Sequence, residues 1–476
     1  MFLHVSKYDW LSLRANRSFY VIIALMSGLV WFSLWVGVKR IAFQQETLQK
    51  IATQQQADYE KYRKLISDIN AGMHFDGGHF GDPTNPFYFG NRMGAQYASL
   101  PPAPLAIISV GQSDLMPYYY KITLSKRQAL FHSEELENPQ VLYNGHFDLA
   151  FVIVFLLPLL IVALSYQIIS SEREQGTLPL LLSENVSLRT IAGYRYLFRY
   201  LLFHVLLTLF IVIGLLLAGV SLIANADRLF ALLIAVWIYG AFWFSVAYLV
   251  NSIGHSSGIN AAILVSIWLL LMVFVPALLS VWVNRVYPMP SRIALIAQSR
   301  QIADELAKNK DALQRFYEEH PELKPVQANP QDRTASMLFS RLQVELSMEK
   351  EREAFTLQAA ARRQMVNRYR LFSPSIIMIE LLNEIASTGE TVYSDFDKQV
   401  AAYHSRFRDY FAPLVFRQEK FGVAQLEGVP KFQYHAPNFQ PLAASFGSNL
   451  IYMCCLALAG IFIASYRTVK ISPAYN

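Results

Sequence analysis

Residues 171–187 read SEREQGTLPLLLSENVS, a charged and then leucine-rich stretch that lies between two long apolar runs. The run before it, residues 147–169, reads FDLAFVIVFLLPLLIVALSYQII, and the run after it covers residues 197–222. Each run is long enough to cross a hydrocarbon core of about 30 Å as a helix, whereas the leucine cluster is too short to do so. The stretch therefore predicts a membrane protein whose chain leaves the bilayer here and then re-enters it.

The composition of the whole chain agrees with this prediction. Of 476 residues, 54% are hydrophobic and 16% are charged, which is a smaller charged fraction than soluble domains usually carry. The apolar runs are continuous and do not alternate with polar residues, so we expect helices and not a barrel. Six runs qualify as spans, namely residues 18–38, 147–169, 197–222, 229–251, 259–284 and 444–466.

Basic residues near the ends of these runs predict the orientation. Six crossings place both termini on one side, together with residues 170–196, and on that side bases such as Arg14, Arg173 and Arg467 outnumber acids. Short segments with a basic excess stay in the cytoplasm. We therefore expect both termini in the cytoplasm. The formal charge of +6 is then a consequence of topology and does not indicate a nucleic-acid partner.

The two long connections, residues 39–146 and 285–443, are then expected outside the cytoplasm. Residues 39–71 read as a helix that continues outward from the first span. LAIISV (105–110) and YYYKITL (118–124) read as strands. In the second connection, residues 296–319 and 334–371 carry apolar side chains at helical spacing among balanced charges, with a Pro/Asn-rich break between them. The bland interpretation is a solvated helical cap. The sharper one is a lid or collar over a path through the membrane.

Several polar residues could carry chemistry, but no pattern in the sequence demands it. His74 and His79, with Asp76 and Asp82, could bind a metal, yet they lie in a Gly-rich stretch without further ligands, so we expect no metal site. His204 is expected to face the bundle interior in a packing role. Asp148 is expected at the membrane interface, and Pro158 and Pro276 are expected to kink their helices. The only cysteines, Cys454 and Cys455, are neighbours in the sixth run and are not expected to pair.

Motifs of known enzymes are missing from the sequence. HExxH, GxSxG and the phosphate-binding GxxxxGK[ST] do not occur. We therefore expect a chain without catalytic residues or a cofactor of its own. If the protein does work driven by ATP, another chain must hydrolyse it.

The stretch 170–187, called the knuckle below, has the composition of a docking site. Ser170 or Ser171 can cap a short helix with Glu172 and Glu174 in its first turn. Gly176 and Thr177 allow a break, after which the leucines of LPLLL are presented outside the bilayer. An exposed apolar patch beside fixed charges is typical of a protein-binding surface. The alternative is an interfacial amphipathic hairpin with no partner.

Residues 172–197, EREQGTLPLLLSENVSLRTIAGYRYL, closely resemble the cytoplasmic coupling segment of type-two ABC exporter permeases. In that family a pattern of the form ExExGTLexLLsxPvs follows the second span. Asn185 stands where the family often has Pro. LHVSKYDWLSLRANRS (3–18) resembles the family's membrane-parallel elbow helix. PPAPLAIISVGQSDLMPYYYKIT (101–123) resembles the first-loop signature of a subgroup related to multicopper-enzyme-maturation permeases, which has large segments after the first and fifth spans.

The resemblance implies a mainly α, polytopic fold with six transmembrane helices. Residues 1–17 would form the elbow helix and residues 170–196 the coupling segment. The segments 39–146 and 285–443 would be extracytoplasmic, largely helical and with minor β structure in the first. It implies a location in the bacterial inner membrane and a function as the permease subunit of an ATP-driven exporter.

The implied partners are two copies of an ABC ATPase subunit, which would bind ATP and Mg, a second permease chain, identical or related, and membrane lipid. The implied coupling surface consists of Glu172, Arg173, Glu174, Gly176, Thr177, Leu178 and Leu181. The charged residues would position the ATPase subunit, and the leucines would pack into its groove. The cargo is left open. So is the alternative of a membrane anchor or mechanotransmitter whose outer domains regulate an envelope partner without transport.

Overall fold

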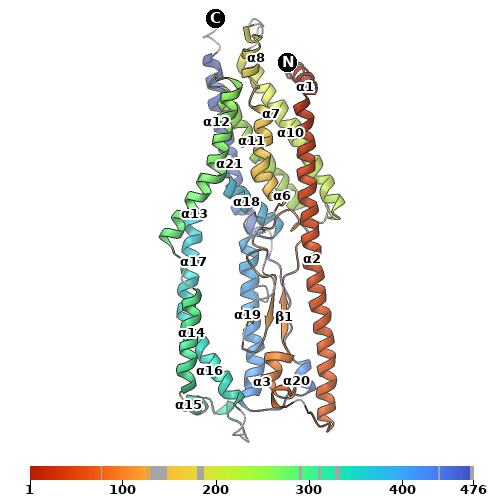
Figure 1. Ribbon diagram of the computed structural model, residues 1–476, viewed down its shortest axis with the longest axis vertical. Helices are drawn as coiled ribbons and strands as arrows, with labels where there is room; N and C mark the ends of the chain where they lie inside the picture. The colour runs from red at the N-terminus through yellow and green to blue at the C-terminus, as the bar shows by residue number, and fades with distance from the viewer. Residues whose placement is uncertain are drawn as a thin grey trace.

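The computed structural model describes residues 1–76, 78–125, 127–128, 147–179, 187–288, 292–308, 312–326, 333–437 and 440–471. The described chain is an elongated and mainly helical molecule (Figure 1). A bundle of apolar helices forms one end, and both termini lie there. The other end, called the distal region below, contains the second half of the long helix α2 (Arg17–Asn70), a small sheet and the helices α14 to α17, α19 and α20, whereas α18 packs in the bundle.

Six helical segments are long and apolar enough to cross a membrane, as the sequence predicts. The chain is therefore a multi-pass membrane protein. These segments are Arg17–Asn70 (α2), Leu149–Glu174 (α6 at Leu149–Phe151, then η3, α7 and α8), Leu188–Leu217 (α10), Ala226–Asn251 (α11), Ser257–Val286 (α12 at Ser257–Leu269, η4, and α13 at Val275–Val286) and Gly447–Thr468 within α21 (Gln440–Ile471).

The third span begins nine residues earlier than residue 197, where the sequence placed it. Helix α10 starts at Leu188 because Ser187 caps it, with its hydroxyl accepting from the backbone N–H of Thr190 at 3.3 Å. The charged first turns of α10 are therefore helical, although hydropathy alone assigns them to a loop.

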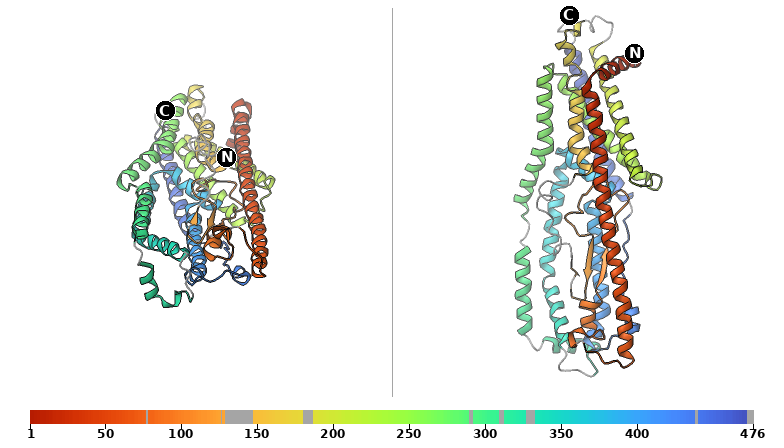
Figure 2. Two further views of the ribbon diagram at one scale, coloured as in Figure 1. Left: turned by 60° about the horizontal axis from the view of Figure 1, so that its bottom comes forward. Right: turned by 45° about the vertical axis from the view of Figure 1, so that its right-hand side comes forward.

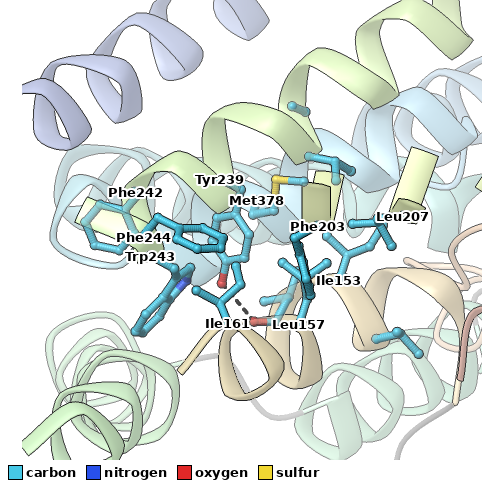
Figure 3. Close-up of a cluster of buried hydrophobic side chains, with 14 of the residues drawn as sticks. Ile153, Leu157, Ile161, Phe203, Leu207, Tyr239, Phe242, Trp243, Phe244 and Met378 are labelled. Atoms are coloured by element: carbon cyan, nitrogen blue, oxygen red, sulfur yellow. Dashed lines mark hydrogen bonds between the residues drawn. The ribbon is translucent and has the colours of Figure 1, made fainter. Parts of the chain in front are cut away.

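Helix α11 forms the centre of the bundle. It packs along α21, α7 (Leu157–Ser165), α10 and α18 (Pro374–Ala386). Tyr239 and Trp243 of α11 are completely buried, and Figure 3 shows Tyr239 with Phe203 of α10 on one side and Trp243 on the other. Because large aromatic side chains fill this space, the described bundle of a single chain is closely packed around α11.

A short π-helical segment precedes each of the two prolines at which the sequence predicts a kink. The segment η3 (Val152–Leu156) precedes Pro158, and η4 (Leu270–Phe274) precedes Pro276. Proline lacks the N–H that a helix needs, so nearby carbonyl groups lose a donor. Other helices supply replacements. The Tyr239 hydroxyl donates to the Val154 carbonyl at 2.8 Å, and the Trp268 indole N–H donates to the Phe155 carbonyl at 3.0 Å.

The distal region is built around a second, aromatic core. Helix α19 (Glu390–Phe416) supplies Phe407 and Phe411, and the segments around it supply Phe89 and Phe421, whose rings stack at 4.5 Å. The strands β1 (Gln96–Ser99) and β2 (Tyr119–Ile122) pair antiparallel, with Gln96 opposite Ile122, and β3 (Arg127–Gln128) extends this sheet. The minor β structure predicted in the first connection is confirmed.

The second connection is helical where the sequence predicts it. Its helices are α14 (Arg292–Lys308), α15 (Ala312–Glu319), α16 (Thr334–Ser347), α17 (Glu349–Tyr369), α18, α19 and α20 (Val423–Glu427). Short pieces complete the described chain, namely α1 (Phe2–Ala15), η1 (His79–Gly81), α3 (Pro86–Tyr88), η2 (Phe89–Met93), η5 (Pro321–Leu323) and η6 (Arg370–Phe372). Figures 1 and 2 show α14 and α17 on the side of the molecule away from α2, with α19 between them and α2.

The prediction of a strand at LAIISV is wrong. Residues 105–110 form turns and are buried where the bundle meets the distal region. Arg40 of α2 donates to the carbonyls of Ala106 at 2.9 Å and Ser109 at 3.2 Å. The Ile107 carbonyl lies so close to Gly37 that any side chain there would collide with it. The apolar run is therefore explained by burial between helices, and its backbone is satisfied by side chains.

Asp148 lies at the start of the second span, as the sequence predicts, and it is buried by the protein there. Its side chain is 7% exposed and accepts from the backbone N–H groups of Val110 and Phe151, both at 2.7 Å. The second of these bonds caps the second span, and the first holds the buried turn of residues 105–110.

Candidate functional site

The knuckle leaves the bundle at the end where both termini lie (Figure 1). Helix α7 ends at Ser165, a turn follows, and α8 covers Ser170–Glu174. Gly176 has a φ of +72°, a left-handed conformation that favours glycine, and the Thr177 N–H returns to the Glu172 carbonyl at 2.9 Å. This closes α8, as the sequence predicts for Gly176 and Thr177. Residues 180–186, including Leu181, lie outside the described residues.

The serine cap predicted for α8 is not formed. The residue before the helix is Ile169, and no side chain caps it. The Ser170 hydroxyl instead lies 2.8 Å from the Ser257 hydroxyl, at the start of α12. The knuckle is therefore tied to the turn between α11 and α12 from its first residue.

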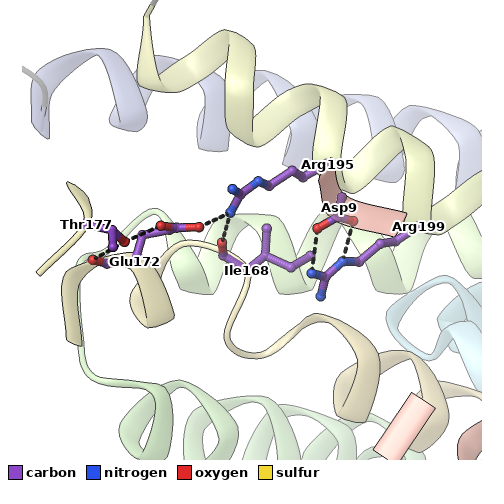
Figure 4. A network of polar contacts seen from close by, with 6 residues as sticks. All are labelled: Asp9, Ile168, Glu172, Thr177, Arg195 and Arg199. Carbon is purple, nitrogen blue, oxygen red and sulfur yellow. Dashed lines mark hydrogen bonds and ion pairs between the residues drawn. The ribbon is translucent and has the colours of Figure 1, made fainter. Parts of the chain in front are cut away.

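Glu172 joins the knuckle to α10. Its carboxylate forms an ion pair with Arg195 at 2.7 Å and accepts from the Thr177 hydroxyl. The side chains of Glu172 and Arg195 are only 20% and 17% exposed, and Figure 4 shows them between α8 and α10. Arg195 also donates to the Ile168 carbonyl at 3.4 Å.

Arg173 and Glu174 join the knuckle to the start of the fifth span. The Arg173 guanidinium donates to the Gly254 carbonyl in the turn between α11 and α12. Glu174 accepts from the backbone N–H of Ser257 at 2.6 Å and from its hydroxyl at 2.9 Å. A carboxylate at a helix N-terminus satisfies free N–H groups and interacts favourably with the helix dipole. Glu174 thus caps α12 from another part of the chain.

Leu178 does not lie where the docking interpretation puts it. We expected it to pack into a partner's groove, but its side chain is 2% exposed. It closes a small apolar cluster with residues from the end of the second span and the start of α10, namely Ile168, Ile169, Leu188, Ile191 and Ala192. Leu178 therefore stabilises the knuckle from within. The exposed residues of the described knuckle are Glu174, Gln175, Gly176, Pro179 and Ser187.

A second ion pair lies beside the knuckle and is not identified from the sequence. Arg199, one turn beyond Arg195 on α10, binds Asp9 of α1 through two hydrogen bonds of 2.8 Å and donates to the Leu164 carbonyl at 2.7 Å (Figure 4). The side chains of Asp9 and Arg199 are 2% and 9% exposed. Two arginines four residues apart at the start of an apolar helix are the only signal in the sequence for these contacts.

These contacts join α1, α8, α10 and α12 at one end of the bundle. Each charged side chain of Glu172, Arg173 and Glu174 has a partner within the chain. A push on the exposed rim of the knuckle would therefore be passed to the third span through Arg195 and to the fifth span through Ser257.

The histidines singled out in the sequence do not form a metal site among the described residues. His74 is 92% exposed and lies 3.4 Å from Asp76, while the His79 side chain lies outside the described residues. His204 is completely buried, and its ring lies against Gly240, where a Cβ atom would collide with it. Its Nδ1 atom lies 2.9 Å from the Tyr200 carbonyl. His204 therefore faces the bundle interior, as predicted, although its buried Nε2 atom has no hydrogen-bond partner among the described residues.

Comparison with known proteins gives a family match within the second connection. Residues 292–435 match the family model described as a domain of unknown function, DUF3526. The match starts at α14 and ends beyond α20, and it includes neither the knuckle nor any of the six spans. The chain matches none of the curated proteins with which it was compared.

Proposed function

We propose that the chain is the transmembrane permease subunit of an ATP-driven ABC exporter. The observation that carries this proposal is the knuckle, a charged segment outside the bundle that is bonded to the third and fifth spans through Arg195 and Ser257. Its sequence resembles the coupling segment of exporter permeases. A segment that receives force from an ATPase must pass it to the spans, and these bonds provide the connection.

The proposed orientation follows from charge and from the position of the termini. Both termini and the knuckle lie at one end of the molecule (Figure 1), and the short segments there have a basic excess, which is typical of the cytoplasmic side. The distal region would then be extracytoplasmic, in a bacterial inner membrane. Helix α1, joined to α2 through the extended residue Asn16, would be the elbow helix.

The complex would contain two ATPase subunits, which bind ATP and Mg, and two permease chains. The fifth span fits an interface between the permeases, because only 11% of its most apolar window is buried within one chain. Closure of the ATPase subunits would move the knuckle, and the links through Arg195 and Ser257 would shift α10 and α12. The cargo path would then open between the two chains.

The test introduces a positive charge on the exposed rim of the knuckle and leaves its internal bonds intact. Gln175 is exposed, so Gln175→Arg is expected to fold normally and to release the ATPase subunit from the complex purified out of native membranes. Gln56→Arg, at an exposed position of α2 in the distal region, is the control. If the Gln175 variant retains its ATPase subunit and its full ATP hydrolysis, the knuckle is not the contact.

A second function, mechanical transmission without transport, is favoured by one specific feature. Helix α2 runs without a break through 54 residues, which at about 1.5 Å per residue gives a rod of about 80 Å. Figure 2 shows this rod passing from the bundle to the far end of the distal region. Such a helix could carry a movement of the bundle to an envelope partner. An experiment that separates the two functions is argued at the end of the Discussion.

A further inference from the structure

A cavity of about 570 Å³ lies where the ends of the fifth and sixth spans meet the distal region. Val283 of α13 and Asn449 of α21 line it from the spans. Helix α17 forms one wall, and α18 with the start of α19 forms the other (Figure 1). Its volume is in the range of binding sites for small ligands. We call it the junction cavity.

The two walls carry opposite charges. Arginines line the α17 side, and glutamates line the α18 and α19 side. Two pairs neutralise each other across the cavity, because Arg363 binds Glu390 and Arg370 binds Glu380 at 2.5 Å. The remaining charged side chains that line the cavity are Arg362 and Glu384.

Arg362 and Glu384 have no partner of opposite charge among the described residues. The Arg362 guanidinium donates to two neutral groups, the Tyr287 carbonyl at 3.0 Å and the Asn284 side chain at 2.7 Å. Glu384 accepts from the Thr391 hydroxyl at 3.0 Å through Oε1, while its Oε2 atom is buried and has no hydrogen-bond donor. A buried carboxylate oxygen without a donor is costly. A bound cation that can donate hydrogen bonds would remove that cost.

The position of Glu384 is fixed by its surroundings. Its carboxylate lies against Gly389, where a Cβ atom would come within 2.5 Å of Oε1. Burial, together with the nearby Glu380 and Glu390, raises the pKa of Glu384. A carboxylate surrounded in this way favours a positively charged ligand over another anion.

Aromatic side chains of the kind found at membrane interfaces lie beside the junction cavity. Trp282 of α13 and Tyr369 of α17 pack edge to face at 4.6 Å, and Tyr452 of α21 donates to the Leu371 carbonyl at 2.9 Å. Trp and Tyr gather at the headgroup level of a bilayer. The neighbouring side chains of Leu278 and Phe372 are 66% and 69% exposed. A ligand with acyl chains could therefore lie along this apolar surface with its headgroup in the cavity.

We propose that the junction cavity binds the headgroup of a zwitterionic phospholipid that carries a primary ammonium group, with the ammonium at Glu384 and the phosphate at Arg362. A primary ammonium has three N–H donors, one of which would satisfy the free Oε2 atom of Glu384. A quaternary ammonium has none. A headgroup that is only anionic would leave Glu384 without a counter-charge. This site depends on the membrane position of the spans and not on the proposed export function.

The test measures lipid binding to the full chain in detergent micelles by native mass spectrometry. Phosphatidylethanolamine, phosphatidylcholine and phosphatidylglycerol with the same acyl chains are the probes, and free glycerophosphoethanolamine tests whether the headgroup alone suffices. Wild-type protein is expected to bind phosphatidylethanolamine about tenfold more tightly than the other two lipids. The reason is that loss of one hydrogen bond to a charged group weakens binding by this factor or more. The free headgroup is expected to bind far more weakly.

The variants Glu384→Gln and Arg362→Met are each expected to weaken phosphatidylethanolamine binding about tenfold. Arg362→Lys keeps the charge and is expected to keep most of the binding. Glu353→Gln and Arg368→Met, at exposed positions of α17, are matched controls that should bind like wild type. Elution as a single species and an unchanged helical circular dichroism spectrum establish that each variant is folded.

Two results would overturn the proposal. Equal binding of the three lipids, or unchanged binding by folded Glu384→Gln protein, would show that the cavity does not select a primary ammonium. Binding of glycerophosphoethanolamine as tight as that of the lipid would assign the cavity to a soluble ligand. Loss of the ATPase subunit plays no part in this measurement, so a failure here is distinguishable from a failure of the proposed function.

Discussion

At the scale of single residues, the contact between Asp9 and Arg199 is the one most sensitive to change. Two charges taken out of water gain from each other only if both are present and well bonded. Asp9 and Arg199 meet this condition, since two hydrogen bonds of 2.8 Å join them and the Leu164 carbonyl occupies a further donor. The pair fixes α1 to α10 beside the knuckle, so its loss would free the N-terminal helix.

Replacing one member, as in Asp9→Asn, is expected to destabilise the protein by about 3–5 kcal/mol, because Arg199 is then left buried without a counter-charge. Removing both charges, as in Asp9→Leu with Arg199→Met, is expected to restore much of that loss. The measurement is the thermal unfolding midpoint in detergent for the two single variants and the double variant.

The control for this cycle is Arg189→Met, an exposed position on the same helix α10, which should change the free energy of unfolding by no more than about 0.5 kcal/mol. Additive losses in the double variant would contradict the pairing. A single Asp9→Asn change with no effect would show that water, and not Asp9, solvates Arg199.

Replacing Glu384 is expected to stabilise the protein, whereas replacing Asp9 is expected to destabilise it. Burial raises the pKa of its carboxyl group in the folded chain, and the charged groups that line the cavity with it are Glu380, Glu390, Arg362, Arg363 and Arg370. Between the ordinary carboxyl pKa and this raised value, the folded state binds more protons than the unfolded state, so stability falls as pH rises. Glu384→Gln is therefore expected to raise the unfolding midpoint at pH 7 in lipid-free detergent and to flatten its pH dependence above the ordinary carboxyl range.

The matched control is Glu319→Gln, at an exposed position at the end of α15, which should change neither the midpoint nor its pH profile. A Glu384→Gln protein that is less stable than wild type at pH 7 would show that the carboxylate has a stabilising partner.

At the scale of helices, each proline in a span is compensated by side chains from another helix. The Tyr239 hydroxyl of α11 serves the Val154 carbonyl of the second span, and Ser375 of α18 lies 3.4 Å from the Leu271 carbonyl of the fifth. A proline kink in a membrane helix persists only where such donors are present. The kinks therefore depend on the packing of α11 and α18 and not on proline alone.

Tyr239→Phe tests this dependence, because it removes the donor and keeps the ring. We expect a loss of about 1 kcal/mol, and at most about 2 kcal/mol, as is typical of hydrogen bonds between membrane helices. Tyr20→Phe, on the lipid-facing side of α2 where Tyr20 is 53% exposed, should have no effect on the unfolding midpoint. Equal midpoints for the Tyr239 and Tyr20 variants would mean that the Val154 carbonyl finds another donor.

The sequence predicts those parts of the fold that depend on local pattern. Hydropathy finds all six spans, and helical spacing finds the helices of the second connection. It fails where the tertiary environment decides. LAIISV is apolar enough for a strand, but its backbone is held by Arg40 from α2. Leu178 looks exposed in the sequence because the residues that cover it, such as Ile191, come from the next helix.

In the candidate site, too, the sequence predicts the local features and not the contacts between helices. Gly176 and Thr177 end α8 as local turn chemistry requires. The partners of Glu172 and Glu174, Arg195 and Ser257, lie in other spans. Because no local pattern records which charges meet across helices, only the folded chain shows that the knuckle is bonded to the bundle.

At the scale of the whole molecule, two hydrophobic cores share one chain. One lies in the bundle around α11, and the other, aromatic core lies in the distal region around α19. Helix α2 passes along both cores, and its Arg40, which is bonded to the carbonyls of Ala106 and Ser109, lies between them. Movement of the bundle can therefore reach the distal region through α2. A chain that transmits force would depend on this route, whereas a chain that only exports would not.

Thr53→Pro separates these two functions. Thr53 is exposed in the part of α2 beyond the bundle, and a proline in a helix interior costs about 3 kcal/mol and kinks the helix. If the protein is an exporter driven through the knuckle, ATP hydrolysis by the complex and its stimulation by cargo remain within about twofold of wild type, because the links through Arg195 and Ser257 are unchanged. We expect this outcome. Thr53→Ala is the matched control, since it keeps the helix straight. The alternative outcome is that Thr53→Pro abolishes regulation of the envelope partner while ATP hydrolysis stays intact, and that Thr53→Ala does not. This result would establish α2 as a force-transmitting rod.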